Sequence, residues 1–191
     1  AEWDQVVATA AREDDVWASV GIHPHNADGH ADLARETLLD ATHHPKVVGI
    51  GETGLDYFYD KSDRTTQQAL FRMHIDVARE TGLPLIIHTR DAEEDTAAIL
   101  EDEMGKGTYP APIHCFTASA AFPAERLLVE TDSPFLAPVP HRGKTCEPAY
   151  VANTAQFVAD LRGTSVEELG EQTTRNFHAL FSKTRQQDKA T

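Results

Sequence analysis

Five short apolar runs in this sequence are each followed by an imidazole or a carboxylate. The residues that follow them are His23, Glu52, His88, His114 and Asp132. Imidazole and carboxylate groups that converge suit divalent ions such as Zn, Mn, Fe or Mg, and nitrogen ligands favour the transition metals among these. Two imidazoles and two carboxylates are enough to hold one metal ion and part of a second.

Each of these residues has an ordinary structural explanation when it is considered alone. A single histidine after a strand is more often a hydrogen-bonded core or loop residue. Glu52 could cap a helix, and Asp132, which precedes Ser133-Pro134, could form an Asx turn. The repetition at five strand ends is harder to explain in this way, and it favours a common site.

A common site requires a scaffold in which the ends of the strands meet. The predicted strands are Val16 to Ile22, Val47 to Ile50, Leu83 to Ile87, Arg126 to Val129 and, with a weaker pattern, Ala111 to Ile113. Helical stretches between several of them predict parallel β-α units and therefore an α/β fold. In a parallel barrel the carboxyl ends of all strands converge on one mouth, where such folds place their active sites.

Apolar periodicity and capping residues predict the helices. They cover Arg64 to Thr81, Asp91 to Met104, a segment from Pro148 to Leu161, and a last helix opened by the capping box Ser165 to Glu168. The tail from Ser182 is rich in Lys, Arg and Gln, and we expect it to be frayed and solvated.

The overall composition is that of a globular protein. The 191 residues are 40% hydrophobic and 25% charged, which suits one domain or at most two. No apolar run approaches the roughly 20 residues of a membrane span, and the first residues do not resemble a secretory signal. We therefore expect a cytoplasmic protein that does not associate with membranes. Cys115 and Cys146 form no disulfide framework and no zinc signature, so we expect two reduced thiols.

The net charge of −14 restricts how the protein could bind nucleic acid. A broad cationic surface is excluded, because that mode of binding needs many Lys and Arg residues to neutralise phosphates. A nuclease is not excluded, since bound divalent cations supply positive charge locally where a phosphate approaches carboxylates.

The sequences around the five polar residues resemble the successive signatures of a known family. They are GIHPH (21–25), GETGLDY (51–57), IHTRD (87–91), IHCFT (113–117) and ETDSPFL (130–136). In this order they are similar to the motifs of the TatD deoxyribonucleases, part of the amidohydrolase-like group of TIM barrels. The resemblance extends through Asn176-Phe177, and it implies a TIM (β/α)8 barrel fold.

The resemblance also implies roles for the five residues. Glu52 would bridge or coordinate the metals, His88 and His114 would ligate one of them, and Asp132 would be a ligand or the general base. His23 would lie beside the site and help to orient the substrate. The implied cofactor is a pair of divalent metal ions, Mg, Mn or Zn.

Three basic residues are candidates for phosphate contact under the same resemblance. They are Arg90, which lies two residues after His88 in the sequence IHTRD, and Arg142 and Lys144 in the sequence PHRGK. The alternative is that each is a solvated surface charge, which is the usual state of Lys and Arg.

The chain departs from the family pattern in two places. The family opens with a strand that carries a His-x-His pair, and this chain begins after that point. Between Phe116-Thr117 and Glu125-Arg126 the family has a helix, a strand and a further helix, where this chain has only Ala118 to Ala124. A closed barrel takes about 250 residues. We therefore expect residues 1–191 to form a single hydrolase domain with an incomplete barrel, lacking its first strands and a segment between about 118 and 124.

The resemblance implies a hydrolase that cleaves phosphodiester bonds in DNA, trimming from the 3′ end. One alternative keeps the metal site and changes the substrate to an ester such as that of a D-aminoacyl-tRNA. Another alternative is a non-catalytic scaffold or nucleic-acid-binding remnant, which the absent His-x-His pair would favour. The expected partner is thus DNA or tRNA as substrate, and we expect a monomer.

Overall fold

The computed structural model describes residues 3–114 and 123–189. The chain divides into two compact units, each described here by itself. Unit 1 comprises Ala1–His114 and Phe181–Thr191, and unit 2 comprises Cys115–Leu180. The predicted discontinuity between Ala118 and Ala124 and the thiol of Cys115 fall largely on residues 115–122, outside the described residues.

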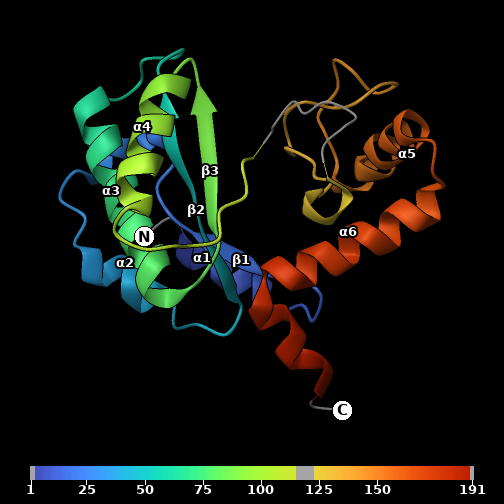
Figure 1. Cartoon of the computed structure of the whole chain (residues 1–191), viewed down its shortest axis with the longest axis horizontal. Helices are drawn as coiled ribbons and strands as arrows, with labels where there is room; N and C mark the ends of the chain where they lie inside the picture. Colours follow the sequence, from blue (N-terminus) through green and yellow to red (C-terminus); the bar gives the residue numbers. More distant parts are fainter. Residues whose placement is uncertain (1–2, 115–122, 190–191) are drawn as a thin grey trace. The chain divides into compact units, whose positions relative to one another are not determined.

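Unit 1 is built on a parallel sheet with the strand order β1-β2-β3 (Figure 1). The strands are β1 (Ala18–Val20), β2 (Val47–Asp56) and β3 (Leu85–Arg90). A further segment runs parallel to β3, because Ile87 pairs with Ile113 and the His114 amide donates to the Ile87 carbonyl at 2.9 Å. Four of the five predicted strand regions therefore lie side by side, and their carboxyl ends share one edge.

Helical segments surround this sheet. They are α1 (Trp3–Ala10), η1 (Pro24–His30), α2 (Arg35–Ala41), α3 (Arg64–Thr81), α4 (Glu93–Met104) and η4 (Ser182–Lys189). Figure 1 shows α2, α3 and α4 together along one side of the sheet. The core between them consists of fully buried apolar side chains, among them Leu38, Ile50, Leu55, Phe71, Ile75 and Leu85.

The ends of α3 agree with the sequence prediction. The Asp63 carboxylate accepts from the amides of Thr65 and Thr66 at 2.9 and 3.1 Å, which satisfies two free N–H groups of the first turn. Gly82 ends the helix in the left-handed conformation with φ of 68°. Helix α4 begins at Glu93, two residues later than predicted, because Asp91 has φ of 51° and lies outside the helix.

Close contact between β2 and β3 depends on glycine. A Cβ atom added to Gly54 would lie 2.0 Å from the main-chain oxygen of His88, and Gly54 has φ of 138°. Only a residue without a side chain fits such an approach. Gly54 therefore brings the strand that carries Glu52 against the strand that carries His88.

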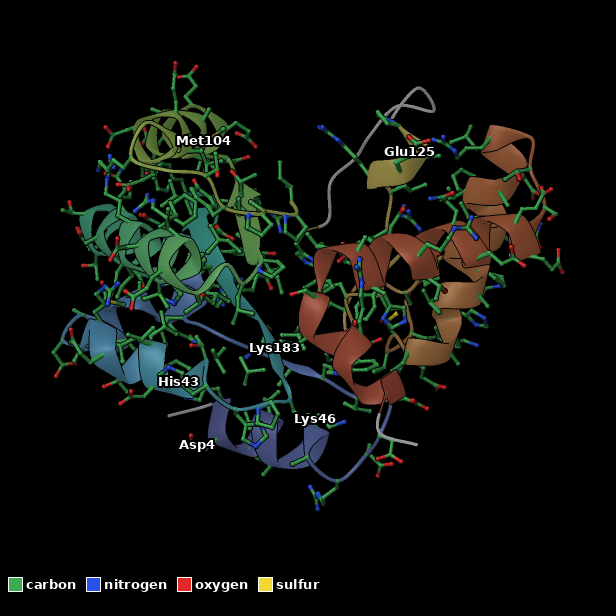
Figure 2. The ribbon with its side chains drawn as sticks, turned by 60° about the horizontal axis from the view of Figure 1, so that its bottom comes forward. Asp4, His43, Lys46, Met104, Glu125 and Lys183 are labelled. Carbon is green, nitrogen blue, oxygen red and sulfur yellow. The ribbon has the colours of Figure 1, made fainter. Side chains whose placement is uncertain are left out.

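The prediction of a frayed tail from Ser182 is wrong for the described part of this segment. Residues Ser182–Lys189 form η4, and Thr184 is buried. The ammonium of Lys183 donates to the carbonyl oxygens of Thr42, His44 and Val47 at 2.7, 3.4 and 2.9 Å (Figure 2). The polar composition of this segment suggested a solvated tail, but its Lys183 donates hydrogen bonds to main-chain oxygens of unit 1.

The regular elements in the described part of unit 2 are all helical. Its elements are η2 (Ala124–Arg126), η3 (Pro148–Tyr150), α5 (Val151–Arg162) and α6 (Val166–Leu180). The capping box is confirmed, since the Ser165 hydroxyl accepts from the Glu168 amide and the Glu168 carboxylate accepts from the Ser165 amide, both at 3.1 Å.

The predicted strand from Arg126 to Val129 is wrong. The segment begins with the last residue of η2, continues without regular secondary structure, and pairs with no strand in the described residues. The side-chain amide of Asn176 on α6 donates to the carbonyl oxygens of Ala124 and Leu127, each at 2.7 Å. A side chain thus satisfies main-chain groups that a neighbouring strand would otherwise bind.

Among the described residues, no helix has both the length and the apolar character that crossing a bilayer requires.

Candidate metal centre

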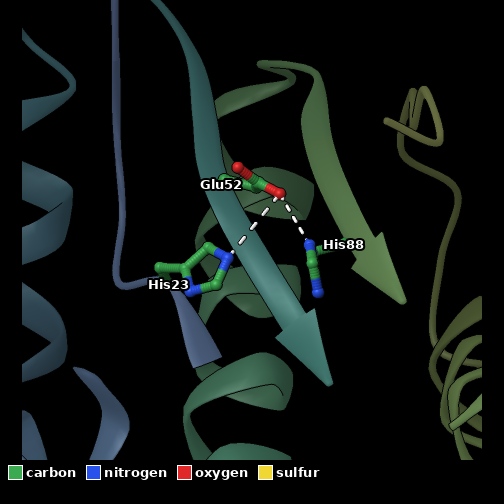
Figure 3. A group of neighbouring side chains, drawn as sticks. All are labelled: His23, Glu52 and His88. Carbon is green, nitrogen blue, oxygen red and sulfur yellow. Dashed lines mark hydrogen bonds and ion pairs between the residues drawn. The ribbon is translucent and has the colours of Figure 1, made fainter. Parts of the chain in front are cut away.

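One carboxylate oxygen of Glu52 lies at the centre of a group of imidazoles. Glu52 Oε1 is 2.8 Å from His88 Nδ1, 3.7 Å from His114 Nε2 and 3.9 Å from His23 Nε2. Figure 3 shows the carboxylate of Glu52 between the rings of His23 and His88. Four of the five residues predicted from the sequence therefore meet at one point in unit 1.

The strand ends position these four side chains. Glu52 lies on β2, His88 lies on β3, and His114 follows the segment that pairs with β3. His23 follows β1 and is the N-cap of η1, where its Nδ1 accepts from the His25 amide at 3.2 Å. The parallel direction of the strands brings all four to the same edge of the sheet.

Burial and neighbouring groups set the charges in this group. Burial lowers the pKa of His23 to about 4, so its ring is neutral at neutral pH. Burial opposes ionisation of Glu52, but the hydrogen bond from His88 and the nearby rings of His114 and His23 outweigh it and hold its pKa below the usual value. Glu52 is therefore a carboxylate at neutral pH, surrounded by nitrogen donors.

Asp56 is a member of the site that the sequence analysis missed. Its side chain is fully buried, and its Oδ2 lies 2.7 Å from His25 Nε2 and 3.1 Å from His88 Nε2. Burial raises the pKa of Asp56, but main-chain and histidine hydrogen bonds outweigh this effect, and the net pKa is lowered. An ionised carboxylate only accepts hydrogen bonds, so both imidazoles present an N–H to Asp56. This leaves His88 Nδ1 as the atom that faces Glu52.

His25 was likewise not predicted as a site residue. A signal for Asp56 was available in the sequence, because it lies four residues after Glu52 on the same strand. Alternation along a strand places residues an even number apart on the same face. No comparable rule identifies His25, whose position depends on the turn that opens η1.

His88 contacts a carboxylate through each ring nitrogen. Burial alone would lower its pKa, but the hydrogen bonds to Glu52 and Asp56 raise it above the usual value. Its ring is thereby fixed in orientation, with Nδ1 toward Glu52 and Nε2 toward Asp56.

The remaining predicted residues are Arg90 in unit 1 and three residues of unit 2. Arg90 is exposed at the end of β3, where it packs on the rings of Phe58 and Tyr59. Asp132, Arg142 and Lys144 belong to unit 2. Arg142 and Lys144 are exposed, and Asp132 is half-buried in a turn closed by the hydrogen bond from the Phe135 amide to the Asp132 main-chain oxygen. Their participation in the site stays a prediction.

The donor set fits a divalent cation. His23, Glu52 and His88 each offer one ligand atom, and these three atoms all lie within 4.8 Å of one another. A carboxylate with imidazoles is the combination that Zn, Mn or Fe binds in proteins. The carboxylate behind His88 adds the partner that metal-binding histidines commonly have on their second nitrogen.

Comparison with known proteins identifies the family. The family model described as TatD related DNase matches residues 1–122 and 117–182. A relative from Escherichia coli K12, named uncharacterized metal-dependent hydrolase YcfH, is 40% identical over 200 residues, which cover 88% of this chain and 74% of the relative. A relative from Enterobacter lignolyticus, named 3′-5′ ssDNA/RNA exonuclease TatD, is 30% identical over 217 residues, covering 94% and 83%.

Solved structures show the same fold. The crystal structure of YJJV, a TatD homologue from Escherichia coli K12, superposes with a TM-score of 0.84 at 25% identity and covers 94% of this chain and 82% of that one. The α/β fold predicted from the sequence, a parallel sheet belonging to a TIM-type barrel, is confirmed. The chain belongs to the TatD-related DNase family of metal-dependent hydrolases.

Proposed function

We propose that this protein hydrolyses phosphodiester bonds in DNA and removes nucleotides from the 3′ end of a single strand. The observation that carries the proposal is the single Glu52 oxygen that faces three imidazole nitrogens at the edge of the sheet. The name of the Enterobacter relative, an exonuclease of single-stranded DNA and RNA, supports the choice of substrate and polarity.

The residues that would hold the metal are Glu52, His88, His114 and, from unit 2, Asp132. A bound divalent ion supplies Lewis-acid chemistry, polarising a phosphoryl oxygen and lowering the pKa of a bound water toward about 7. The proton on His88 Nδ1 is the one that a cation would replace, since imidazole must be deprotonated at the atom that binds. Asp56 keeps the opposite nitrogen, Nε2, protonated.

His23 suits a role in orienting the substrate. Its Nδ1 accepts a hydrogen bond from the main chain, so the neutral ring carries its proton on Nε2, the atom that faces Glu52. With Nε2 protonated, His23 would not ligate the metal, and its N–H is available to donate to an oxygen of the substrate. Glu52 and Asp132 would accept the proton that the attacking water loses, and Arg90, Arg142 and Lys144 would contact phosphates.

The test uses single-stranded DNA labelled at its 5′ end and incubated with the protein and Mg or Mn. We expect labelled products that shorten stepwise from the 3′ end, with no products after chelation of the metal. Glu52→Ala should reduce the rate by about 100-fold or more, the range for loss of a group that takes part in proton transfer. Glu36→Ala, an exposed glutamate on α2, is the matched control and should retain the rate.

Three outcomes would contradict the proposal. If the DNA ends stay intact with both the wild type and Glu52→Ala, the protein is not a nuclease. Glu52-dependent hydrolysis of a D-aminoacyl-tRNA, with DNA untouched, would keep the metal centre but assign it to an aminoacyl ester. Protein that turns over neither substrate and binds no metal would instead be a scaffold.

A further inference from the structure

Two consecutive aromatic side chains are exposed directly after β2. Phe58 is 53% exposed and Tyr59 is 49% exposed, although burying such rings would be favourable. The preceding aromatic residue behaves differently, because the Tyr57 hydroxyl donates to Asp95 at 2.7 Å and accepts from Gln68 at 2.8 Å. Of these three consecutive aromatic residues, only Phe58 and Tyr59 are exposed.

Arg90 joins the two rings into one surface. Its guanidinium carbon lies 4.3 Å from the ring centroid of Phe58 and 4.7 Å from that of Tyr59. The two rings lie 4.9 Å apart in an edge-to-face arrangement. A second cation, the ammonium of Lys61, lies 5.4 Å from the Tyr59 centroid. We call Phe58, Tyr59 and Arg90 the aromatic platform.

The platform is fixed to the candidate metal centre by Asp56. The amides of Phe58 and Tyr59 donate to Asp56 Oδ1 at 3.1 and 3.0 Å, while Oδ2 of the same carboxylate contacts His88. The Tyr59 ring lies 5.2 Å from the ring of His25, and Arg90 follows His88 by two residues on β3. Whatever lies on the platform is therefore held next to the group around Glu52.

We propose that the aromatic platform binds a nucleobase of single-stranded DNA by stacking on Phe58, with Arg90 and Lys61 contacting the adjoining phosphates. This inference rests on the proposed function and names how that site selects its substrate. Every nucleobase has a flat π face, so stacking of this kind tolerates any sequence. The faces of bases inside a duplex are covered by their neighbours, so the platform selects unpaired strand ends.

The charges around the platform also fit a nucleotide. A guanidinium that lies on a ring keeps its N–H groups in plane at its edge, where they can meet phosphate oxygens. On the side of Tyr57, a pocket of about 400 Å³ is lined by Asp91, Glu93, Glu94 and Asp95. Those carboxylates repel phosphate, which leaves the side of Arg90 and Lys61 for the backbone of the strand.

The test measures binding of a fluorescent single strand with phosphorothioate linkages, which resist hydrolysis, in the presence of Mg. Phe58→Ala should weaken binding about 5- to 100-fold, the range for loss of one base–aromatic stack. Phe58→Trp should retain it, because the indole offers a larger face. Phe157→Ala is the matched control, since Phe157 is 67% exposed on α5 of unit 2, and it should leave the affinity unchanged.

A strand with an abasic nucleotide then tests for stacking itself. The abasic position is moved stepwise from the 3′ end. At one position the loss caused by Phe58→Ala should disappear, because the base that stacks is already absent. Equal losses on intact and abasic strands at every position, or no loss beyond that of Phe157→Ala, would overturn the proposal. If cleavage requires Glu52 but binding does not require Phe58, the proposal for the aromatic platform is refuted and the nuclease activity stands. If binding requires Phe58 but no cleavage occurs, only the nuclease activity is refuted.

Discussion

At the scale of single residues, the site depends on one buried carboxylate as much as on the groups that face the solvent. Asp56 accepts hydrogen bonds from His25, His88 and two main-chain amides. Because the carboxylate has no proton to donate, it dictates which nitrogen of each imidazole carries hydrogen. The orientation of His88 toward Glu52 is a consequence.

Replacement of Asp56 by asparagine tests this dependence. The amide oxygen can still accept from the Phe58 and Tyr59 amides, but its NH2 group would then face His88 Nε2. That nitrogen must become an acceptor, so the neutral ring keeps its one proton on Nδ1, the atom directed at Glu52, where a metal would have to bind. We expect Asp56→Asn to weaken binding of Mn or Zn by about 10- to 100-fold, as for other partners of metal-binding histidines.

Titration calorimetry measures the metal affinity of Asp56→Asn, and nitrogen-15 shifts of the His88 ring report its tautomer. Asp40→Asn, an exposed change on α2, serves as the control. Unchanged affinity together with an unchanged His88 tautomer would show that Asp56 does not position the ring.

The residues that face the site were predictable, whereas the contacts of the residues behind them were not. His23, Glu52, His88 and His114 follow strands, and parallel strands carry such residues to one edge. Alternation along β2 indicates the face on which Asp56 lies, but its contacts with His25 and His88 join distant parts of the sequence, and hydrophobic periodicity does not encode them. For Asp132, sequence motif alone supports a place in the site.

At the scale of elements, a buried histidine ties α3 to the loop that carries His23. His74 is fully buried, its Nε2 accepts from the Ile22 amide at 3.0 Å, and its Nδ1 donates to the Leu70 carbonyl at 2.7 Å. The contact with Ile22 requires the neutral ring, because Nε2 accepts a hydrogen bond only when it carries no proton. Burial lowers the pKa of His74 to about 4.

This arrangement predicts that stability falls with acidity. In the unfolded chain His74 has a pKa of about 6.5, so it binds a proton as the pH falls below that value. In the folded chain it binds the proton only near pH 4. The contribution of His74 is therefore complete above pH 6.5 and declines as pH falls toward 4, by roughly 3 kcal/mol in total. His74→Gln, whose side-chain oxygen can still accept from the Ile22 amide, should remove this part of the decline.

Urea unfolding between pH 7 and pH 4 gives the two profiles to compare. Tryptophan fluorescence is a suitable signal because both tryptophans of the sequence, Trp3 and Trp17, lie in unit 1. His43→Gln is the control, since His43 is exposed, and it should leave the pH profile unchanged. If the unfolding free energies of the wild type and of His74→Gln fall in parallel as the pH is lowered, then burial does not prevent His74 from binding a proton in the folded protein.

Local signals predicted the helices better than the last strand. Helix α3 was predicted at its observed bounds because Asp63 and Gly82 act through contacts with their own neighbours. The run from Arg126 to Val129 has the composition of a strand, but a strand also needs a partner. Its main-chain groups find the Asn176 side chain instead, a contact between residues far apart in the sequence.

At the scale of the whole molecule, unit 1 is discontinuous in sequence. The chain leaves it after His114 and returns at Phe181. The returning segment places Phe181 against Gly49 of β2 and Lys183 against three carbonyl oxygens around the start of that strand. Residues from the carboxyl-terminal part of the chain therefore pack against the strand that carries Glu52.

Removing the charge of Lys183 should thus destabilise unit 1 although the residue is remote from the site. Lys183→Met keeps much of the aliphatic length but leaves the oxygens of Thr42, His44 and Val47 without this donor. Hydrogen bonds from charged groups contribute about 1.5 to 3 kcal/mol each, and the cost of burying the ammonium, which lowers the pKa of Lys183, offsets part of the total. We expect the free energy of unfolding, followed by tryptophan fluorescence, to fall by about 1 to 3 kcal/mol net.

The control is Lys144→Met, at an exposed lysine of unit 2, which should change the free energy of unfolding by less than about 0.5 kcal/mol. Equal stability of the two variants would mean that the carbonyl oxygens are satisfied equally well without Lys183, and that the returning segment is held by the packing of Phe181 alone.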